Sequence, residues 1–239
     1  MQFKHLVVAL LVLAVSAPLA LAGDVVAMPT GNSVPAKTVQ VNYIYWNTDA
    51  INTPVGKVRD FINIGEVFVG VTDRLEIDYL YAAPQGWDKV SDNSFVNEVN
   101  AYYTVVKEAP GRHPQLILGA TNLTGADWLP SLQRPNPDGG DDRVSPFAVA
   151  SYNIQTPNGA PNWDKPLVRA HLGFGTGWHD NAFFGGVQTM FTPKIGLAVF
   201  NYQRYPAYLV AYMPIPGMEL NAGYDHGAPL AHVSYNLHW

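Results

Sequence analysis

The chain has 239 residues, a formal net charge of −5, no cysteine, and charged side chains at only 14% of its positions. An acidic chain without a basic run argues against a nucleic-acid partner, and the lack of cysteine excludes disulfides and thiolate metal sites. The many Gly, Pro, Tyr and Phe residues suit short strands joined by turns. This composition fits a soluble β-sandwich as well as a β-barrel.

The first 22 residues have the pattern of a secretory signal peptide. Lys4 precedes the apolar run 6–15, and Ala20 and Ala22 form a small-residue cleavage site. The apolar run is shorter than the roughly 20 residues that a membrane-spanning helix needs. We therefore expect residues 1–22 to direct export and to be removed, and the absence of a following cysteine excludes a lipoprotein anchor.

An irregular, Pro- and Gly-containing leader is expected at 23–37, followed by one domain at 38–239. From residue 38 apolar and polar residues alternate, which is the period of a strand with two unlike faces. The pattern predicts twelve strands, most of them near the roughly 9–11 residues that a tilted strand needs to cross a bilayer. Their expected ranges are 38–47, 61–71, 75–82, 97–107, 115–122, 145–155, 167–175, 182–191, 195–202, 205–213, 217–224 and 230–239.

The connections between these strands differ in length. Tight turns are expected at 72–74, 192–194 and 214–216, whereas 48–60 and 123–144 are long. Outer-membrane barrels have short periplasmic turns and longer outer loops, so an even strand number would place both termini in the periplasm. The long link at 156–166 and the short outer links at 203–204 and 225–229 depart from this pattern, and ten or fourteen strands remain compatible with it.

Periodicity alone does not say which face of a strand meets lipid, because a soluble sandwich alternates in the same way. The strands 195–202 and 205–213 are apolar on both faces. They would pack on an internal plug, fill a narrow lumen, or form the centre of a sandwich. Aromatic residues near strand ends would form the interfacial girdles of a barrel. These are Tyr43, Tyr45, Tyr81, Phe191, Tyr205 and Tyr224.

The last nine residues, 231–239, alternate strictly and end on Trp239. Tryptophan suits the boundary between membrane and water, so Trp239 is expected to be an interface anchor. Pairing of 38–47 with 230–239 would close the barrel.

This ending resembles the C-terminal strand of bacterial outer-membrane β-barrels, in which a terminal aromatic is read by the assembly machinery. Residues 70–77 resemble a hairpin of several outer-membrane barrel families. The leader at 28–35 is similar to the start of porin-like barrels grouped with aromatic-compound transporters and exopolysaccharide-associated barrels. The resemblance implies outer-membrane lipid and the barrel-assembly machinery as partners.

No motif of a familiar enzyme or metal site is present: the chain lacks Gly-x-Ser-x-Gly, His-Glu-x-x-His and a phosphate-binding Gly loop with Lys. Some twelve-stranded outer-membrane phospholipases use Ser, His and Asn, and His232, Ser234 and Asn236 share one strand face. Alternate residues of a strand are roughly 6.5 Å apart, too far for a nucleophile–base hydrogen bond of about 2.6–3.2 Å. We expect no enzymatic activity, no cofactor and no metal.

Two loop motifs are also expected to be solvated and without function. Asp138–Asp142 offers carboxylates and Gly to a calcium ion but lacks the ligand spacing of a calcium loop. His179–Asp180 is expected to be a simple loop pair.

Charged and imidazole side chains on the inner faces of the predicted strands are the candidate lumen lining. They would tune solute preference or brace the wall through a polar network. The candidates are Glu66, Glu98, Arg169, His171, Glu219, His232 and His238.

The sequence thus predicts an all-β protein, a closed antiparallel transmembrane β-barrel of about twelve strands in the cell outer membrane. It would be a porin-like passive channel for small solutes or a structural barrel. The alternatives are a secreted, soluble β-sandwich that binds a ligand and, less favoured, a barrel that hydrolyses lipid.

Overall fold

The computed structural model describes residues 33–47, 52–53, 56–57, 61–84, 96–109, 111–125, 144–155, 168–177, 181–192, 194–202, 205–225 and 228–238. Within these ranges no helix is long and apolar enough to span a membrane. The expected signal peptide lies outside them, as does Trp239.

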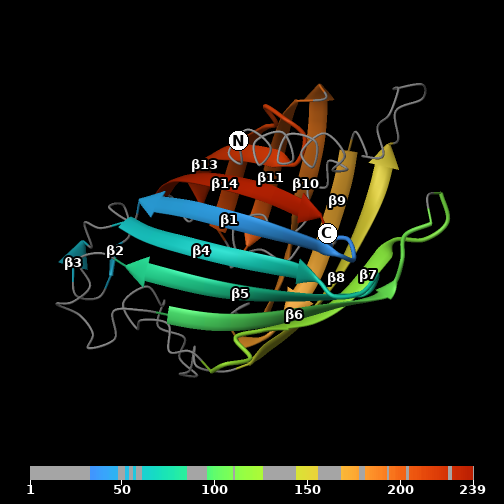
Figure 1. The fold of residues 1–239 in the computed structure, drawn as a ribbon, viewed down its shortest axis with the longest axis horizontal. Coiled ribbons are helices and arrows are strands. Elements are labelled where there is room, and N and C mark those ends of the chain that lie inside the picture. The colour runs from blue at the N-terminus through green and yellow to red at the C-terminus, as the bar shows by residue number, and fades with distance from the viewer. Residues whose placement is uncertain are drawn as a thin grey trace, which may run out of the picture.

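Twelve antiparallel strands form one sheet that closes on itself (Figure 1). The strands of the barrel are β1 (Thr38–Asn47), β4 (Phe61–Gly70), β5 (Leu75–Pro84), β6 (Val96–Val106), β7 (Gln115–Thr121), β8 (Ser145–Gln155), β9 (Val168–Gly175), β10 (Ala182–Thr192), β11 (Ile195–Tyr202), β12 (Tyr205–Tyr212), β13 (Met218–Asp225) and β14 (Ala228–His238). A short hairpin, β2 (Asn52–Thr53) with β3 (Gly56–Lys57), lies in the connection between β1 and β4.

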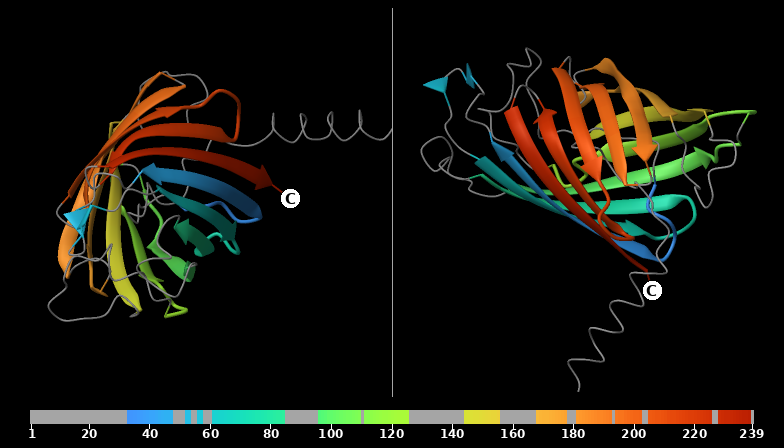
Figure 2. Two further views of the ribbon diagram at one scale, coloured as in Figure 1. Left: turned by 90° about the vertical axis from the view of Figure 1, so that its left-hand side faces the viewer. Right: turned by 90° about the horizontal axis from the view of Figure 1, so that it is seen from above.

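The seam that closes the sheet is the predicted one. β1 pairs with β14 from Thr38↔His238 to Trp46↔Leu230, and its other edge pairs with β4. Every barrel strand therefore has two neighbours, and Figure 2 shows the strands curving around a common axis. The expected barrel of about twelve strands is confirmed. The alternative of a β-sandwich is wrong, because a sandwich has two separate sheets with open edges.

Each strand boundary lies within about two residues of its expected position. The largest differences are at the ends of β5 and β14, where pairing with the neighbouring strand continues through Pro84 and Pro229. Proline lacks an amide donor, so it weakened the sequence signal at both places. The true ends of β5 and β14 follow from pairing with the neighbouring strand, which the local sequence pattern does not give.

The start of β1, the end of β14 and the turn at 71–74 lie at one end of the barrel, which we call the turn end. The β2–β3 hairpin lies at the opposite, loop end (Figure 1). The turn at 71–74 is held by Thr72, whose hydroxyl accepts the amide protons of Arg74 and Leu75. Thr192 does the same at the β10–β11 turn for Lys194 and Ile195.

Polar side chains point inward and apolar side chains point outward. In β1 the side chains of Thr38, Gln40 and Asn42 are at most 2% exposed, whereas those of Val41 and Tyr43 are 42% and 50% exposed. The same division holds in β6, β9 and β13, where the sequence alternates as expected. A soluble β-protein would bury its apolar face. Here the apolar faces point outward, so they are the faces that would meet lipid, a choice that periodicity alone left open.

On the inner wall of β7–β11, three glycines face aromatic rings of the neighbouring strand. Three directly paired positions place an inward Phe against a Gly of the preceding strand: Phe147 on Gly119, Phe184 on Gly173 and Phe200 on Gly186. A Cβ atom at any of these glycines would overlap the opposing ring. Because glycine has no side chain, each ring packs closely against the neighbouring strand and the interior stays filled.

Gly173→Ala should therefore destabilise the barrel by about 1–3 kcal/mol, the usual range for overpacking a filled interior. The new methyl group would overlap Phe184 and lie 2.9 Å from the Ala148 carbonyl oxygen. Gly65→Ala is the matched control, because a Cβ there meets nothing within 4 Å. The urea midpoints of the two variants in detergent, with the folded fraction measured by heat-modifiable gel migration, test this prediction. Equal midpoints would contradict the packing of Phe184 on Gly173.

Candidate functional site: the lumen wall

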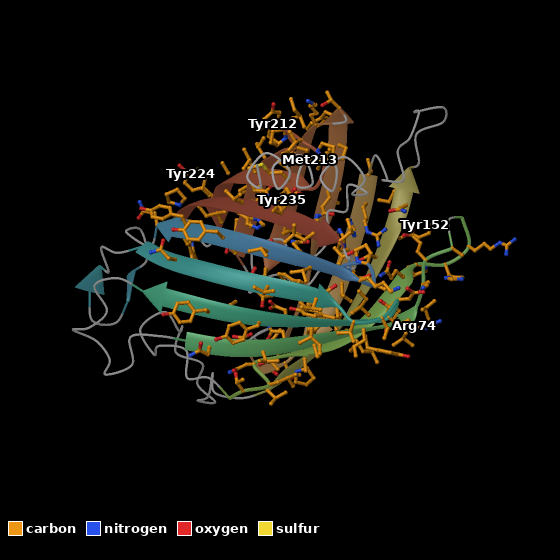
Figure 3. The ribbon with its side chains drawn as sticks, viewed as in Figure 1. Arg74, Tyr152, Tyr212, Met213, Tyr224 and Tyr235 are labelled. Atoms are coloured by element: carbon orange, nitrogen blue, oxygen red, sulfur yellow. The ribbon has the colours of Figure 1, made fainter. Side chains whose placement is uncertain are left out.

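The outer surface carries two rings of aromatic residues separated by an aliphatic belt. Phe183 is 73% exposed at the loop end of β10, and Phe191 is 64% exposed at its turn end. The segment between them covers about 26 Å along the strand, or about 20 Å if the strand is tilted, close to the apolar band of roughly 25 Å in outer-membrane barrels. Figure 3 shows Tyr224 near the loop end and Arg74 near the turn end.

The aromatic rings include most of the residues expected from the sequence. At the loop end, Tyr43, Tyr45, Tyr81, Phe174, Phe183 and Tyr224 are exposed; at the turn end, Tyr103, Phe191 and Tyr212 are exposed. The side chain of Tyr205 lies outside the described set. Near the loop end the hydroxyl groups of Tyr43 and Tyr79 donate to Asn63 and Asn97. Amphipathic rings with polar partners at this level suit the boundary of a bilayer.

One half of the inner wall, which we call the polar half, carries a chain of buried polar side chains, with apolar residues such as Ile44, Ile64 and Leu80 among them. At the turn end, the hydroxyl of Thr38 lies 2.7 Å from Nδ1 of His238 across the closing seam. Gln40 donates to Asn42, and Asn42 donates to the carboxylate of Glu66. These side chains belong to β1, β4 and β14, and all except the partly exposed His238 are buried.

The polar half continues across β5, β6 and the start of the following loop. Asn100 donates to Asp78 over 2.8 Å. The amide of Asn122 donates to Glu98 and to the side-chain oxygen of Asn100. Asn122 has a positive φ of 56°, which lets the chain leave β7 while its amide turns inward. Carboxylates and amides thus form a connected network that reaches from Asp78, near the turn end of β5, to Asn122 at the loop end of the wall.

The opposite half of the interior is apolar. A cluster of buried side chains from β6–β12 packs together with Phe68 of β4 and Leu230 of β14. The rings of Tyr102 and Phe147 have centroids 5.6 Å apart, and those of Phe184 and Tyr202 5.8 Å apart. The strands that are apolar on both faces, β11 and β12, supply Phe200, Tyr202 and Leu209 to this cluster. Their inner faces therefore fill the lumen, which is one of the three arrangements expected from the sequence. The remaining members are Val34, Ile117, Val149, Ala198 and Ala207.

A chain of three polar residues crosses the apolar half. Ser151, His171 and Gln188 lie on β8, β9 and β10, and all are buried. Gln188 Oε1 lies 3.2 Å from His171 Nε2, and Ser151 Oγ lies 2.7 Å from Nδ1. If Nε2 carries the proton, it donates to Gln188 and Nδ1 accepts from the serine hydroxyl. The ring of His171 also packs against Phe200 with centroids 6.0 Å apart.

Arg169 is held by a polar cluster at the turn end. Its Nη1 lies 2.6 Å from Glu108 Oε2 and 2.7 Å from Asn153 Oδ1, and its Nη2 lies 3.3 Å from Gln115 Oε1. The other oxygen of Glu108 accepts the amide of Asn153. Both side chains of the ion pair are less than 10% exposed. This cluster fastens the β6–β7 connection to the inner wall of β9.

The residues just before β1 lie inside the barrel. We call residues 33–37 the inner leader. Val34 is 2% exposed within the apolar cluster, and its amide donates to the carboxylate of Glu76. The amide of Lys37 donates to the Gly70 carbonyl over 2.9 Å. The inner leader thus lies on β4 and β5 at the turn end.

The structure places all seven candidate lumen residues on the inner faces of their strands. Glu66, Glu98, Arg169, His171 and His232 are buried; Glu219 and His238 are partly exposed. They do not form one site. Instead they lie in separate networks: Glu66 with Asn42, Glu98 with Asn122, Arg169 with Glu108, and His171 with Ser151. His232 and Glu219 both contact Asn221, and His238 contacts Thr38.

Sequence reasoning missed the partners that complete these networks. Ser151, Gln188, Glu108, Glu76 and Asp78 were not singled out, because each meets its partner across strands rather than within one motif. Strand register is the signal that would find them: Ser151 pairs directly with His171 once β8 and β9 are aligned.

The three residues weighed as a hydrolytic set, His232, Ser234 and Asn236, all face the interior and are buried. Nδ1 of His232 accepts from Asn221 of β13 rather than from Ser234. The described residues contain no group of three His, Asp or Glu side chains placed to hold a metal ion. Asp138–Asp142, His179 and Asp180 lie outside the described residues.

No protein-family model and no curated protein matches the chain. Solved structures that match include an outer membrane channel from Pseudomonas putida F1, with 14% identity, a TM-score of 0.35, and coverage of 87% of this chain and 97% of that chain. A de novo designed transmembrane β-barrel matches at 11% identity and a TM-score of 0.26, covering 85% of this chain and 98% of that one.

The N-terminal β-barrel domain of OprF from Pseudomonas aeruginosa matches at 11% identity and a TM-score of 0.24, with coverage of 86% of this chain and 100% of that domain. These are proteins of the kind that the sequence resembles. At such identities and TM-scores the likeness carries no argument about function, and the fold assignment rests on the strand pairing described above.

Arg169→Met should cost about 3–5 kcal/mol of stability, because it leaves the Glu108 carboxylate buried without its cation. The double variant Arg169→Met, Glu108→Met should recover most of that loss. Lys107→Ala is the control: its ion pair with Asp73 is long, at 3.5 Å, and its side chain is 53% exposed, so a change below about 1 kcal/mol is expected. Denaturant midpoints of the four proteins test this; equal losses for Arg169→Met and the double variant would contradict the buried pair.

Proposed function

We propose that the protein is an outer-membrane barrel that passes small polar solutes in the manner of a porin. The observation that carries the proposal is the band of polar side chains on the polar half of the inner wall, which runs from Thr38 and His238 at the turn end, through Glu66 and Asp78, to Glu98 and Asn122 at the loop end. Burying polar and charged groups costs free energy. A barrel that only had to be stable would gain more from an apolar interior like its other half.

The proposed location follows from the outer surface. An aliphatic belt between two aromatic rings suits lipid and would be costly in water. Outer-membrane lipid is therefore the proposed partner of this surface, with the turn end in the periplasm. Recognition of the C-terminal strand by the barrel-assembly machinery stays a proposal from the sequence.

Some buried polar atoms of the wall make no hydrogen bond within the described residues. They include Gln40 Oε1, Thr121 Oγ1, His232 Nε2 and His238 Nε2. Buried polar groups almost always have partners, so this hydrogen-bonding capacity is available to water or to a polar solute in the lumen. The atoms are distributed over β1, β7 and β14, which suits a path better than one tight binding site.

The charge of the wall supports a preference for cations. Inward acids of the described barrel strands are Glu66, Glu76, Asp78, Glu98, Glu219 and Asp225, whereas Arg169 is the one Lys or Arg among those strands, and it is paired with Glu108. Acidic rings favour cation passage in channels.

A structural barrel is the second candidate, and the sealed interior favours it. Most inward side chains are less than a tenth exposed, so passage requires some part of the filling to move. A barrel without passage would need no such movement.

The mature protein should partition into the outer membrane and, in planar bilayers, should show discrete conductance steps. Heat-modifiable migration on gels identifies the folded barrel in each preparation. A folded protein that stays monomeric in solution without detergent would contradict the membrane location. A folded membrane barrel without any conductance would leave the structural candidate.

The acidic wall predicts a reversal potential displaced toward the cation equilibrium potential in a salt gradient. Glu66→Gln with Glu98→Gln should bring it closer to zero, because two inward charges are removed. Asp73→Asn is the control, since it removes an acid whose side chain is 75% exposed in the turn at 71–74. If the double variant and the control have the same reversal potential as the parent, the wall charges do not set the preference.

A further inference from the structure

The inner leader, residues 33–37, contacts the barrel through backbone as well as side chains. Lys37 has a positive φ of 59°, a conformation that residues with a side chain rarely adopt, and its amide is bonded to Gly70. This turn directs the chain from the start of β1 back into the lumen. The preceding Val34 then lies in the apolar cluster with Phe68, which is fully buried.

Gly70, the last residue of β4, lies against the backbone of the inner leader. A Cβ atom at this position would overlap the carbonyl group of Pro35 and would lie 2.8 Å from the Val34 carbonyl oxygen. Both groups belong to the backbone, so no side-chain rotation would relieve the overlap. The contact exists only because residue 70 is glycine.

A carboxylate of the polar half fixes the other side of the inner leader. Glu76 of β5 accepts the amide of Val34 and is itself 3% exposed. A charge-assisted hydrogen bond is stronger than a neutral one. The inner leader therefore contacts both halves of the wall: the Val34 side chain lies on the apolar half and its amide on the acidic half.

These contacts lie where solutes would enter or leave at the turn end. The inward side chains of that level, Thr38, Gln40, Glu76 and Asp78, are all at most 3% exposed. The proposed solute path requires these four polar side chains to be accessible to water, whereas in this structure they are covered.

We propose that the inner leader is a plug bound in cis, seated on Gly70, Glu76 and Phe68, and that its displacement opens the turn end of the lumen. The proposal rests on the proposed function, because a plug has meaning only in a barrel that conducts. The occupant of the seat is this segment of the chain itself.

Cysteine labelling tests the seat without relying on conductance. The chain contains no cysteine, so Val34→Cys provides a single thiol for a membrane-impermeant maleimide in the folded, reconstituted barrel. Labelling should be slow in this variant. It should be faster by on the order of 10-fold when Gly70→Ala is added, because the overlap with the Pro35 backbone shifts the two-state population toward the released leader. Gly65→Ala is the matched control on the same strand, where a Cβ meets nothing within 4 Å. Asp73→Cys gives the rate of an exposed thiol.

Conductance of the same proteins in planar bilayers tests the plug. Gly70→Ala should raise the open probability over the parent and over Gly65→Ala. Val34→Asp should do the same by a different route, since it places a charge in the apolar cluster and leaves the wall unchanged; it covers the case in which Gly70→Ala does not fold.

The outcomes separate the two proposals. Rapid labelling of Val34→Cys in the parent background, at the rate of Asp73→Cys, would overturn the seat whatever the conductance. Labelling that rises with Gly70→Ala, in a barrel that already conducts equally in the parent, would overturn the plug and leave the channel. Release of the inner leader without conductance in any variant would overturn the channel, and the plug with it.

Discussion

The structure depends on closure of the sheet between β1 and β14. In lipid, each backbone donor and acceptor without a partner costs several kcal/mol, and a sheet meets this constraint only when it has no edge. Nine directly paired residues on each strand, from Thr38 opposite His238 to Trp46 opposite Leu230, close the seam. Once the sheet is closed, the alternation of the strands determines the rest: one face must be outside and the other inside.

The inside face is divided between two kinds of packing. On β6–β12, aromatic rings lie over glycines of neighbouring strands and fill the interior as in a compact core. On β1, β4, β5 and β14, amides and carboxylates satisfy one another in short networks. The apolar half contributes stability at little polar cost, and the polar half supplies the chemistry from which the proposed solute path follows. The inner leader lies where the two halves meet.

Much of the fold was predictable, since period-2 alternation marks strands and turn residues mark their ends. Strand number and the β1–β14 seam follow from such local signals. The site was only partly predictable. Glu66, His171 and His232 were recognised as inward residues by their strand phase, whereas Ser151 and Glu76 were not, because their partners come from other strands or from the leader. The proximity of Pro35 to Gly70 has no sequence signal beyond one glycine at a strand end.

The position of the inner leader has a consequence for the order of assembly. All other neighbouring strands of the barrel follow one another in sequence, whereas the contact between Thr38 and His238 spans 200 residues. Closing the longest loop carries the largest entropic cost, so sequential hairpins form at lower cost than the seam. Val34 is tethered four residues before Thr38 and ends inside the wall. A chain that closed its seam with the leader outside would have to reopen it or thread the segment back through the mouth. The moment when β1 meets β14 is therefore the point in assembly at which the leader reaches its place inside the wall most directly.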